Sequence, residues 1–296
     1  MKFLFYPGCS MDASALEYKT SMLAVCAALD LEAVELSDWT CCGASVASVM
    51  SDLLGLVLPA RNLALAEQAG DGRQMVVGCS ACLTSFQHTN AAVADRGVLD
   101  RVNQALEVEN LAYHGTVRVR HLLDVLANEV GPKAIGARVV RPLTGLKVAP
   151  YYGCQTVRPY ASFDDGQYPS SMVPILEALG ATVHHHLHEA TCCGTALLTT
   201  KPELGLQIAG SILDASSPAD CIATVCPMCH MNLDSYQDKV SKALGKPIKI
   251  PVLFLPQLIG LAFGFTEGDL HFKRHVVPVD PVQAKALRPE TVQGFT

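Results

Sequence analysis

Residues 40–43 read Thr-Cys-Cys-Gly and residues 191–194 read Thr-Cys-Cys-Gly again, and this repeated stretch decides how the chain is organised. In both copies a Gly-Cys pair, Gly8-Cys9 or Gly153-Cys154, precedes the stretch and a Cys-x-x-Cys pair follows it. The same order of motifs in both parts of a 296-residue chain indicates an internal duplication. Ten of the twelve cysteines belong to this frame: Cys9, Cys41, Cys42, Cys79, Cys82, Cys154, Cys192, Cys193, Cys226 and Cys229.

Short apolar runs lead into the cysteines of both halves, and segments with helical spacing follow them. We expect strands at residues 2–6, 33–36, 74–77, 146–151, 182–184 and 222–225. Residues 13–29 and 173–179 carry apolar side chains every three or four positions, which predicts helices. This alternation predicts an α/β protein made of two pseudo-symmetric, Rossmann-like halves with mostly parallel sheets. The cysteines are then expected at the carboxyl ends of strands, where ligand groups gather.

The repeat sets the expected boundaries of the chain. Residues 1–140 form the N-terminal repeat, residues 141–275 the C-terminal repeat, and residues 276–296 an extended tail rich in valine and proline. Each repeat is predicted to close with a strand, a turn and a helix, at residues 119–126 in the first half and residues 252–259 in the second.

One apolar stretch, residues 251–265, is the sole candidate for a membrane element. It contains Pro256, Gln257 and Gly260 and is shorter than the roughly 20 residues that a span requires. We therefore expect no transmembrane segment, and we assign this stretch to the core or to a subunit interface.

Composition narrows the functional class. The net charge of -6 and the pI near 5.9 provide no basic surface for phosphate groups, so nucleic acid is not an expected partner. A mean hydropathy of +0.26 is high for a monomer and favours a complex with other subunits. The N-terminus has no signal sequence, which predicts a cytoplasmic protein. In a reducing compartment the twelve cysteines favour metal or redox chemistry over disulfides.

Five framed cysteines per half are one more than a tetrahedral zinc ion or an ordinary four-iron cube takes. This count suggests an unusual iron-sulfur cluster with extra thiolate ligation, and zinc in one half is the alternative. Gly43 and Gly194 are expected to let the backbone turn beneath the paired cysteines. Cys26 and Cys221 lie outside the frame, and we expect them to be inert core residues.

The motifs resemble those of a known family. The segments that carry the resemblance are Phe5-Tyr-Pro-Gly-Cys9-Ser, Glu17-Tyr18, Asp38-Trp39-Thr-Cys41-Cys42-Gly43, Gly78-Cys79-Ser-Ala-Cys82 and the second-half positions Cys154, Cys192, Cys193, Gly194, Cys226 and Cys229. Over essentially its whole length the sequence resembles the B subunit of heterodisulfide reductase, the type member of the cysteine-rich CCG-domain proteins. The resemblance implies one noncubane four-iron four-sulfur cluster in each set of five cysteines.

The resemblance also implies a reaction and partners. A small disulfide would bind between two facing clusters and be split, each sulfur being captured by one cluster iron. Electrons would come from a ferredoxin-like iron-sulfur protein, the C subunit in this family, which is itself supplied by a flavoprotein, the A subunit. The chain has no ferredoxin run of its own, in agreement with such a partner. The thiol substrate and the direction are not fixed by the family, whose bacterial members in sulfur metabolism use other thiols or persulfides.

Several other residues are candidates for a role near the clusters. His230 follows Cys229 and could donate a proton to a leaving thiolate, and His88 is a weaker candidate for the same role. Arg158, and less so Lys19, could meet an anionic group of the substrate. The histidines that precede the second Cys-Cys-Gly could be metal ligands, but hydrogen bonding to the cluster or solvent exposure is the preferred interpretation. These are His184, His185, His186 and His188.

Three functions from different classes follow. The first is the catalytic subunit of a heterodisulfide reductase-like enzyme that cleaves or forms a disulfide. The second is an electron-relay or membrane-docking CCG subunit of a succinate/quinone or lactate/glycolate oxidoreductase. The third is a structural zinc protein. Insertion of residues 251–265 into a membrane surface would favour the second function.

Overall fold

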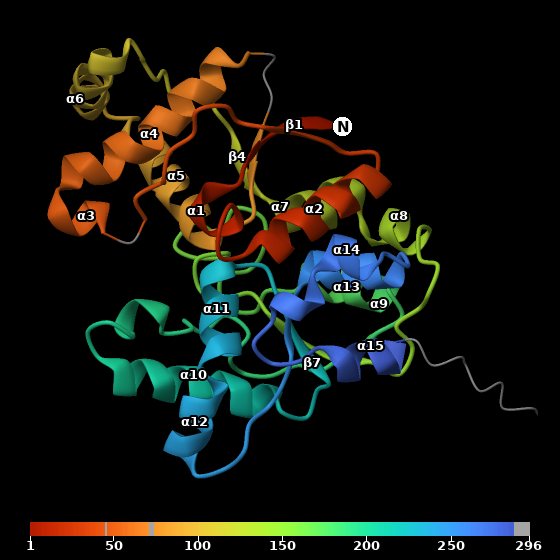
Figure 1. The fold of residues 1–296 in the computed structure, drawn as a ribbon. Helices are drawn as coiled ribbons and strands as arrows, with labels where there is room; N and C mark the ends of the chain where they lie inside the picture. Colours follow the sequence, from red (N-terminus) through yellow and green to blue (C-terminus); the bar gives the residue numbers. More distant parts are fainter. Residues whose placement is uncertain (45, 71–73, 287–296) are drawn as a thin grey trace, which may run out of the picture.

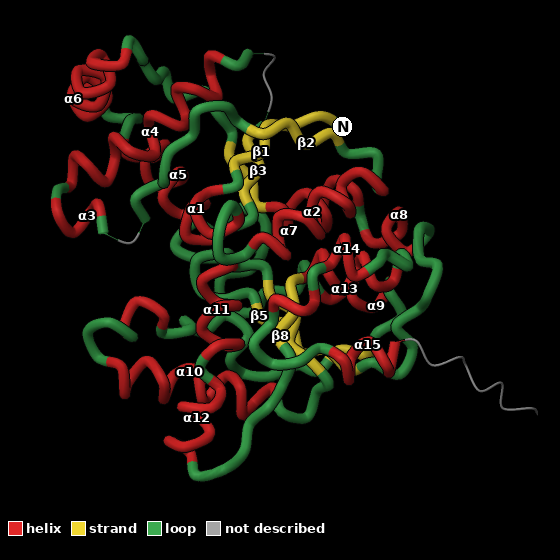
Figure 2. Tube along the Cα trace, in the orientation of Figure 1, coloured by secondary structure: helices red, strands yellow, loops and turns green. Residues whose placement is uncertain are grey.

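Two four-stranded sheets, one from each half of the sequence, form the framework of the protein (Figures 1 and 2). The computed structural model describes residues 1–44, 46–70 and 74–286. The first sheet has the order β2-β1-β3-β4, all parallel, from β1 (Lys2–Tyr6), β2 (Glu32–Glu35), β3 (Met75–Val77) and β4 (Val119–His121). The second has the order β6-β5-β7-β8, all parallel, from β5 (Lys147–Tyr151), β6 (Thr182–Val183), β7 (Cys221–Thr224) and β8 (Val252–Phe254).

Helices connect the strands in both halves and cover the sheets. The first half contains α1 (Gly8–Met11), α2 (Leu16–Ala28), α3 (Ala47–Met50), α4 (Asp52–Gln68), α5 (Ser80–Ala92), α6 (Arg96–Leu106), η1 (Glu107–Glu109), α7 (Leu122–Asp124), η2 (Val125–Val130) and α8 (Pro132–Gly136). The second half contains α9 (Val173–Ala178), η3 (Thr195–Leu197), α10 (Pro202–Ser216), α11 (Pro227–Ser235), α12 (Gln237–Leu244), α13 (Leu255–Ala262), α14 (Glu267–Leu270), η4 (Phe272–Arg274) and α15 (Asp280–Ala286). The predicted α/β fold of pseudo-symmetric halves is confirmed.

The alternation of side chains along β1 explains why the sheet has a core on each face. Phe3 and Phe5 belong to one hydrophobic cluster, whereas Leu4 and Tyr6 belong to the other. Both clusters include residues of both halves, since the first also contains Val148 and the second also contains Tyr151 and Ile222. The two repeats therefore fold onto one another and do not have separate cores.

The helix that follows β8 is a large part of this shared core. All eight residues of α13 are buried, and the helix packs on α2 of the first half, beside α14 (Figure 1). At the same junction the ring of Tyr18 stacks on Phe254 with 4.2 Å between ring centroids. The apolar stretch 251–265 is thus core, as its sequence predicts, and no helix in the described part of the chain is long and apolar enough to span a membrane.

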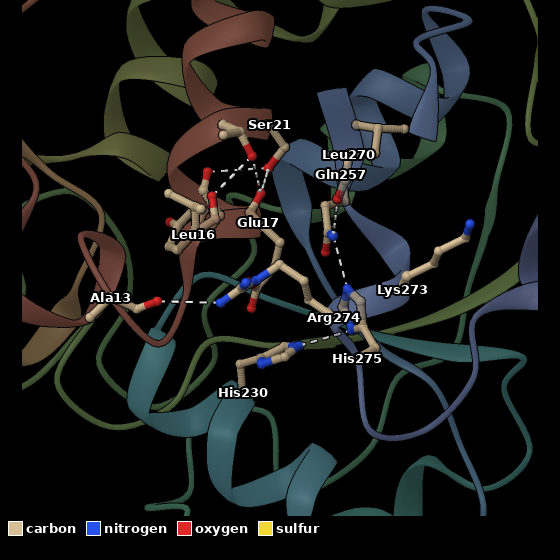
Figure 3. A network of polar contacts seen from close by, with 12 residues as sticks. Ala13, Leu16, Glu17, Ser21, His230, Gln257, Leu270, Lys273, Arg274 and His275 are labelled. Atoms are coloured by element: carbon tan, nitrogen blue, oxygen red, sulfur yellow. Dashed lines mark hydrogen bonds and ion pairs between the residues drawn. The ribbon is translucent and has the colours of Figure 1, made fainter. Parts of the chain in front are cut away.

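A C-terminal segment, residues 272–279, contacts both halves, and Figure 3 shows the contacts of its Arg274 and His275. Arg274 donates from Nε to the Glu17 carboxylate of α2 at 2.8 Å, and from Nη2 to the carbonyl of Ala13 at 3.3 Å. A few residues further, the Asp234 carboxylate of α11 accepts the backbone N–H groups of Val276 and Val277 at 2.7 and 3.0 Å. One segment thus bonds to elements from both repeats.

The end of the chain differs from the extended tail that its composition suggests. Asp280–Ala286 form helix α15, which packs near α13 because Val282 and Ala286 are buried against the first core cluster. A valine-rich segment with apolar side chains four residues apart can bury one helical face, which overrides its weak helix propensity. Residues 287–296 of the predicted tail lie outside the described residues.

The Glu17 to Arg274 ion pair makes a testable contribution to stability. The Glu17 side chain is only 3% exposed, so Arg274→Met leaves a buried carboxylate without its partner. We expect a loss of about 2 kcal/mol in the free energy of unfolding, measured by urea denaturation followed by circular dichroism. The control is Arg138→Met, which breaks the exposed pair with Asp30 and should cost about 0.5 kcal/mol or less. Equal losses in the two variants would contradict the role given to the C-terminal segment.

Candidate metal centre

The parallel sheets bring the cysteine motifs of each half to one edge. In the first sheet Tyr6 pairs with Val77, so the chain leaves β1 and β3 side by side toward Cys9 and Cys79. In the second sheet Tyr151 pairs with Thr224 in the same way, ahead of the second set of cysteines. Each Cys-x-x-Cys pair begins at the cap residue of a helix, Cys79 before α5 and Cys226 before α11. The predicted position of the motifs at carboxyl strand ends is therefore what the structure has.

The ten framed thiols form one continuous line through the protein. The Cys9 and Cys41 sulfur atoms are 3.9 Å apart, and those of Cys42 and Cys82 are 3.1 Å apart. The two sets meet at Cys79 of the first half and Cys226 of the second, whose thiols influence one another's pKa. The order along the line is Cys9, Cys41, Cys42, Cys82, Cys79, Cys226, Cys229, Cys193, Cys192, Cys154, so the second half repeats the first in reverse.

Solvent reaches the two ends of this line but not its middle. Cys9 and Cys41 are exposed at one end and Cys192 at the other, with Cys154 partly buried beside it. The four cysteines of the Cys-x-x-Cys pairs, around the junction of the halves, are all buried. Molecules in solution or on a partner protein can thus approach either end, whereas the junction is shielded from solvent.

Backbone geometry supports the paired cysteines in the same way in both halves. The N–H groups of Gly43 and Gly194 point to the sulfur atoms of Cys41 and Cys192 at 3.5 and 3.4 Å. Both glycines have positive φ, of 70° and 82°, which side chains rarely adopt. A Cβ atom at Gly43 would also approach Cβ of Ala47 to 2.8 Å. The expectation that these glycines allow the turn beneath each pair agrees with this geometry.

A further glycine leaves room beside a sulfur atom. A Cβ atom at Gly153 would lie 2.9 Å from the Cys229 sulfur, and one at Gly8 would lie 3.3 Å from the Cys82 sulfur. The residue before each first cysteine is thus glycine where a side chain would press on a thiolate of the same set. The two sets are built alike in this respect too.

Two tyrosines support the loops that carry the paired cysteines, a role that the sequence did not reveal. The hydroxyl of Tyr6 donates to the carbonyl of Thr40 at 2.7 Å, and that of Tyr151 donates to the carbonyl of Thr191 at 2.7 Å. Burial raises the pKa of both hydroxyls, and the nearby thiols raise it further, so both stay protonated donors. Both tyrosines stand three residues before the first cysteine of their set, Cys9 or Cys154, and this repeated position is the sequence feature that could have identified them.

The thiols of each set strongly influence one another's ionisation. Hydrogen bonds from Cys41 and then Cys82 lower the pKa of Cys42 to about 4. Hydrogen bonds from Cys154 and then Cys193 lower the pKa of Cys192 to about 2. One thiolate per set is therefore stabilised by its neighbours. The pKa values of Cys41 and Cys154 rise because each donates a hydrogen bond to that thiolate, and burial and the nearby negative charge raise them further. Ionising all five thiols of a set needs positive charge, which a metal centre supplies.

His121, at the end of β4, is a further residue of the site that the sequence did not reveal. Its ring is fully buried, and Nδ1 accepts the backbone N–H of Leu123 at 3.1 Å, so the proton of the neutral ring is on Nε2. That atom has no hydrogen-bond partner among the described residues, and the ring lies near the backbone of Gly78 and Val225. Burial lowers the pKa of His121 to about 4, which keeps the ring neutral. An unpaired N–H beside the residues that precede Cys79 and Cys226 fits a donor to cluster sulfur.

His230 and the histidine run at residues 184–188 are bonded to neighbours other than the framed cysteines. The ring of His230 is buried against Phe254, and its Nε2 lies 3.0 Å from the carbonyl of Val252 and 3.2 Å from Nδ1 of His275 (Figure 3). Its role as a proton donor stays a prediction. The run is dispersed: His184 bonds to the carbonyl of Ala215, and the others bond to separate neighbours. Ligation of one metal by all four histidines is not what this arrangement offers.

The remaining predicted residues separate into near and distant ones. The guanidinium of Arg158 donates to the carbonyl of Ala190 and lies close enough to Cys192 to help lower its pKa. His88 faces Tyr160 across the junction at 3.3 Å, and Lys19 forms ion pairs with Asp12 and Glu35. Arg158 is therefore the predicted anion-binding residue that reaches the cysteine line.

Cys26 and Cys221 lie in the first core cluster, apart from this line. Burial alone raises the pKa of Cys26 to about 12, and burial raises that of Cys221 as well. Thiols in such surroundings stay protonated and unreactive. Their assignment as inert core residues remains a prediction that metal analysis of variants can test.

Crowded thiols, backbone N–H groups aimed at sulfur, space beside sulfur and the unpaired N–H of His121 together fit iron-sulfur clusters. One cluster would be held by the five first-half cysteines and another by the five second-half cysteines. Such clusters supply one-electron redox steps when bound. A second group of possible ligands, His230, Asp234 and His275, lies within 4.8 Å of one another, but its atoms already pair with backbone groups or each other.

Comparison with known proteins places the chain in a class and then in a family. Residues 3–87 and 148–234 each match the cysteine-rich domain family CCG, the two matches coinciding with the two repeats. The fold and the line of cysteines thus define a protein with two cysteine-rich domains of the kind that binds iron-sulfur clusters. The chain belongs to the CCG cysteine-rich domain family.

Curated relatives fall into two functional groups. The chain is 37% identical over 280 residues to the 8-methylmenaquinol:fumarate reductase membrane anchor subunit of Wolinella succinogenes, covering 93% of this chain and 97% of that protein. It is 30% identical over 257 residues to the B subunit of ferredoxin:CoB-CoM heterodisulfide reductase of Methanosarcina mazei, covering 84% and 85%. It is 28% identical over 275 residues to a protein of Archaeoglobus profundus that is described as like the heterodisulfide reductase B subunit, covering 90% and 91%. These relatives support an iron-sulfur role in an oxidoreductase of several subunits.

A solved structure shares the fold. The crystal structure of a hypothetical protein from Helicobacter pylori superposes with a TM-score of 0.74 at 16% identity and covers 94% of this chain. The chain spans about half of that protein, 52% of its length. The likeness supports the architecture of two α/β repeats.

Replacing single cysteines should separate the two metal sites. We expect Cys41→Ser to remove the EPR signal of one cluster and Cys193→Ser that of the other, because each belongs to a different set of five. Cys26→Ser, a buried cysteine outside the line, is the matched control and should leave both signals unchanged. Loss of both signals in the control would show that the division of the cysteines is mistaken.

The unpaired N–H of His121 predicts an effect on redox potential. His121→Phe fills the same buried space without the donor, so the iron content should be retained while the midpoint potential of at least one cluster becomes more negative. Redox titration followed by EPR measures this shift. His114→Phe, at an exposed histidine paired with Glu67, is the control and should not move the potential. An unchanged potential in His121→Phe would exclude a hydrogen bond to the cluster.

Proposed function

We propose that this chain is the iron-sulfur subunit of a quinone-linked fumarate reductase or succinate dehydrogenase type complex. In this proposal its two clusters carry electrons between a membrane quinone and the subunits that convert fumarate and succinate. The continuous line of ten thiols, buried at its middle and exposed at both ends, is the observation that carries the proposal. A relay requires this arrangement, since one end must meet a donor and the other an acceptor.

The relatives support the same assignment. Identity to the fumarate reductase protein is 37% and covers 97% of that protein, against 30% and 85% for the Methanosarcina mazei heterodisulfide reductase protein. Among the three candidate functions, the sequence alone favours disulfide chemistry. The greater identity and coverage move the relay function ahead of it. The membrane association that the proposal includes is not assigned to residues 251–265, since α13 is buried.

The residues of the chain have defined tasks in this proposal. Each set of five cysteines holds one noncubane four-iron four-sulfur cluster, and the pair Cys79 and Cys226 keeps the two clusters adjacent. His121 provides a hydrogen-bond donor at the junction. The tyrosines Tyr6 and Tyr151 hold the loops of the paired cysteines in place. Partners of the flavoprotein type and of the ferredoxin-like iron-sulfur type complete the path to the dicarboxylate.

The second candidate is reductive cleavage of a small disulfide, and the junction of the cysteine sets favours it. Splitting one disulfide takes two electrons, and two adjacent one-electron clusters deliver them together. His230 and Arg158 would then serve the thiol and its anionic group. Zinc in one half remains the third alternative, because four of five cysteines would satisfy a tetrahedral ion.

Purification of the intact complex through a tag on this chain tests the proposal. Under anaerobic conditions we expect a flavoprotein and a ferredoxin-like protein to copurify. We also expect the complex to reduce fumarate with a naphthoquinol as the electron donor. Cys79→Ser should lower this rate at least about 100-fold because it interrupts the line at its middle, while Cys26→Ser is the control and should keep the rate. A complex that reduces small disulfides and not fumarate would overturn the proposal in favour of the second candidate.

A further inference from the structure

A cavity of about 560 Å³ lies at one end of the cysteine line. Three loops line it, and one of them ends at Thr191, directly before the exposed Cys192. Its size is that of a site for a small molecule. None of the relatives' names assigns a ligand to this place, and the cysteines themselves do not form its wall. The residues that matter here are Arg158, Tyr168, His185, Leu187, Ala190 and Thr191.

Hydrogen bonds within the chain order the loops of the cavity wall. On one side the Asp165 carboxylate accepts the backbone N–H groups of Gln167 and Tyr168 at 2.7 and 2.6 Å. On the other side the carbonyl of Glu189 accepts the N–H groups of Tyr152 and Gly153 at 2.9 and 3.1 Å. These bonds fix the loops in place, so little ordering is needed when a ligand enters.

Two of the polar side chains in the wall, Arg158 and His185, offer a donor and an acceptor. Arg158 uses one N–H group for the carbonyl of Ala190, and a guanidinium has five in total. His185 places Nδ1 3.0 Å from the Glu189 carboxylate, so in the neutral ring Nδ1 donates and Nε2 is an acceptor. The cavity thus offers an N–H donor for a carbonyl oxygen and a nitrogen acceptor for a hydroxyl group.

The apolar groups at the cavity are unusually exposed. Leu187 is 96% exposed and Tyr168 is 75% exposed, although both are large side chains of the kind that folding normally buries. Both line the same cavity. A ligand with a flat ring and an apolar tail would cover them. A compact, strongly charged ligand would leave them in water.

We propose that this cavity binds the ring of a membrane quinone, with Arg158 donating to a carbonyl oxygen, His185 accepting from the hydroxyl of the reduced form, and Tyr168 and Leu187 covering the ring and the start of its tail. This inference rests on the proposed function and locates the quinone beside Cys192, the exposed end of the second cysteine set. The quinone therefore meets the second-half cluster, which leaves the exposed end at Cys9 and Cys41 to a partner protein of the complex.

Binding of a water-soluble quinone tests the proposal independently of activity. The full chain, purified anaerobically with its metal, is titrated with 2,3-dimethyl-1,4-naphthoquinone by isothermal titration calorimetry. We expect one site, and we expect Arg158→Gln and Leu187→Ser each to weaken binding at least about tenfold. The matched controls are Arg101→Gln and Val108→Ser, at exposed positions of α6 and η1 away from the cavity wall, and these should bind as the native chain does. Iron content and circular dichroism confirm that each variant is folded.

Three outcomes would overturn the inference. The first is that the native chain does not bind the naphthoquinone, and the second is that the cavity variants bind it normally. The third is that oxidised glutathione binds in the cavity, with the same dependence on Arg158, while the naphthoquinone does not. If the naphthoquinone does not bind in this cavity but the complex still reduces fumarate, the quinone site is excluded and the proposed function is kept. If the quinone binds in this cavity but the complex does not reduce fumarate, the proposed function is excluded instead.

Discussion

Repulsion among ten crowded thiolates is the constraint on which the rest of this structure depends. Two unit charges 4 Å apart repel by about 1 kcal/mol in water and by several times that inside a protein. The neighbouring thiols therefore ionise one at a time, as the opposite pKa shifts of Cys42 and Cys41 illustrate. Positive charge must enter the line before all of them can be thiolates. A fold that crowds sulfur in this way is suited to iron-sulfur clusters and poorly suited to remaining without metal.

Everything else in the fold positions this line. Parallel strands bring each motif to one sheet edge, and the packing of α2 on α13 sets the two sheets so that Cys79 meets Cys226. The shared core clusters follow from the same packing, because neither repeat covers its own sheet completely. The pseudo-symmetry is evident at the junction, where the two halves contribute equivalent cysteines. At the end near Cys192, the cavity at Thr191 is lined by residues of the second half.

The sequence predicted the repeat, the parallel sheets and the placement of the motifs, because apolar periodicity and motif spacing are local signals. Contacts between the halves were beyond it. His121 ends an ordinary strand and carries no motif, so only the packing that leaves its Nε2 unpaired marks it. The cavity near Arg158 likewise depends on how separate loops fold together, residues 167–170 and 185–191. The helix at Asp280–Ala286 was missed because it is stabilised by burial against α13 and not by its own composition.

The central claim is that the two sets of cysteines hold two iron-sulfur clusters. The most direct measurement is the count of iron, acid-labile sulfide and zinc per chain after anaerobic purification. Two four-iron clusters predict about eight iron and about eight sulfide atoms, with no stoichiometric zinc. Fewer than about four iron atoms per chain, or zinc in place of iron in one half, would contradict the account.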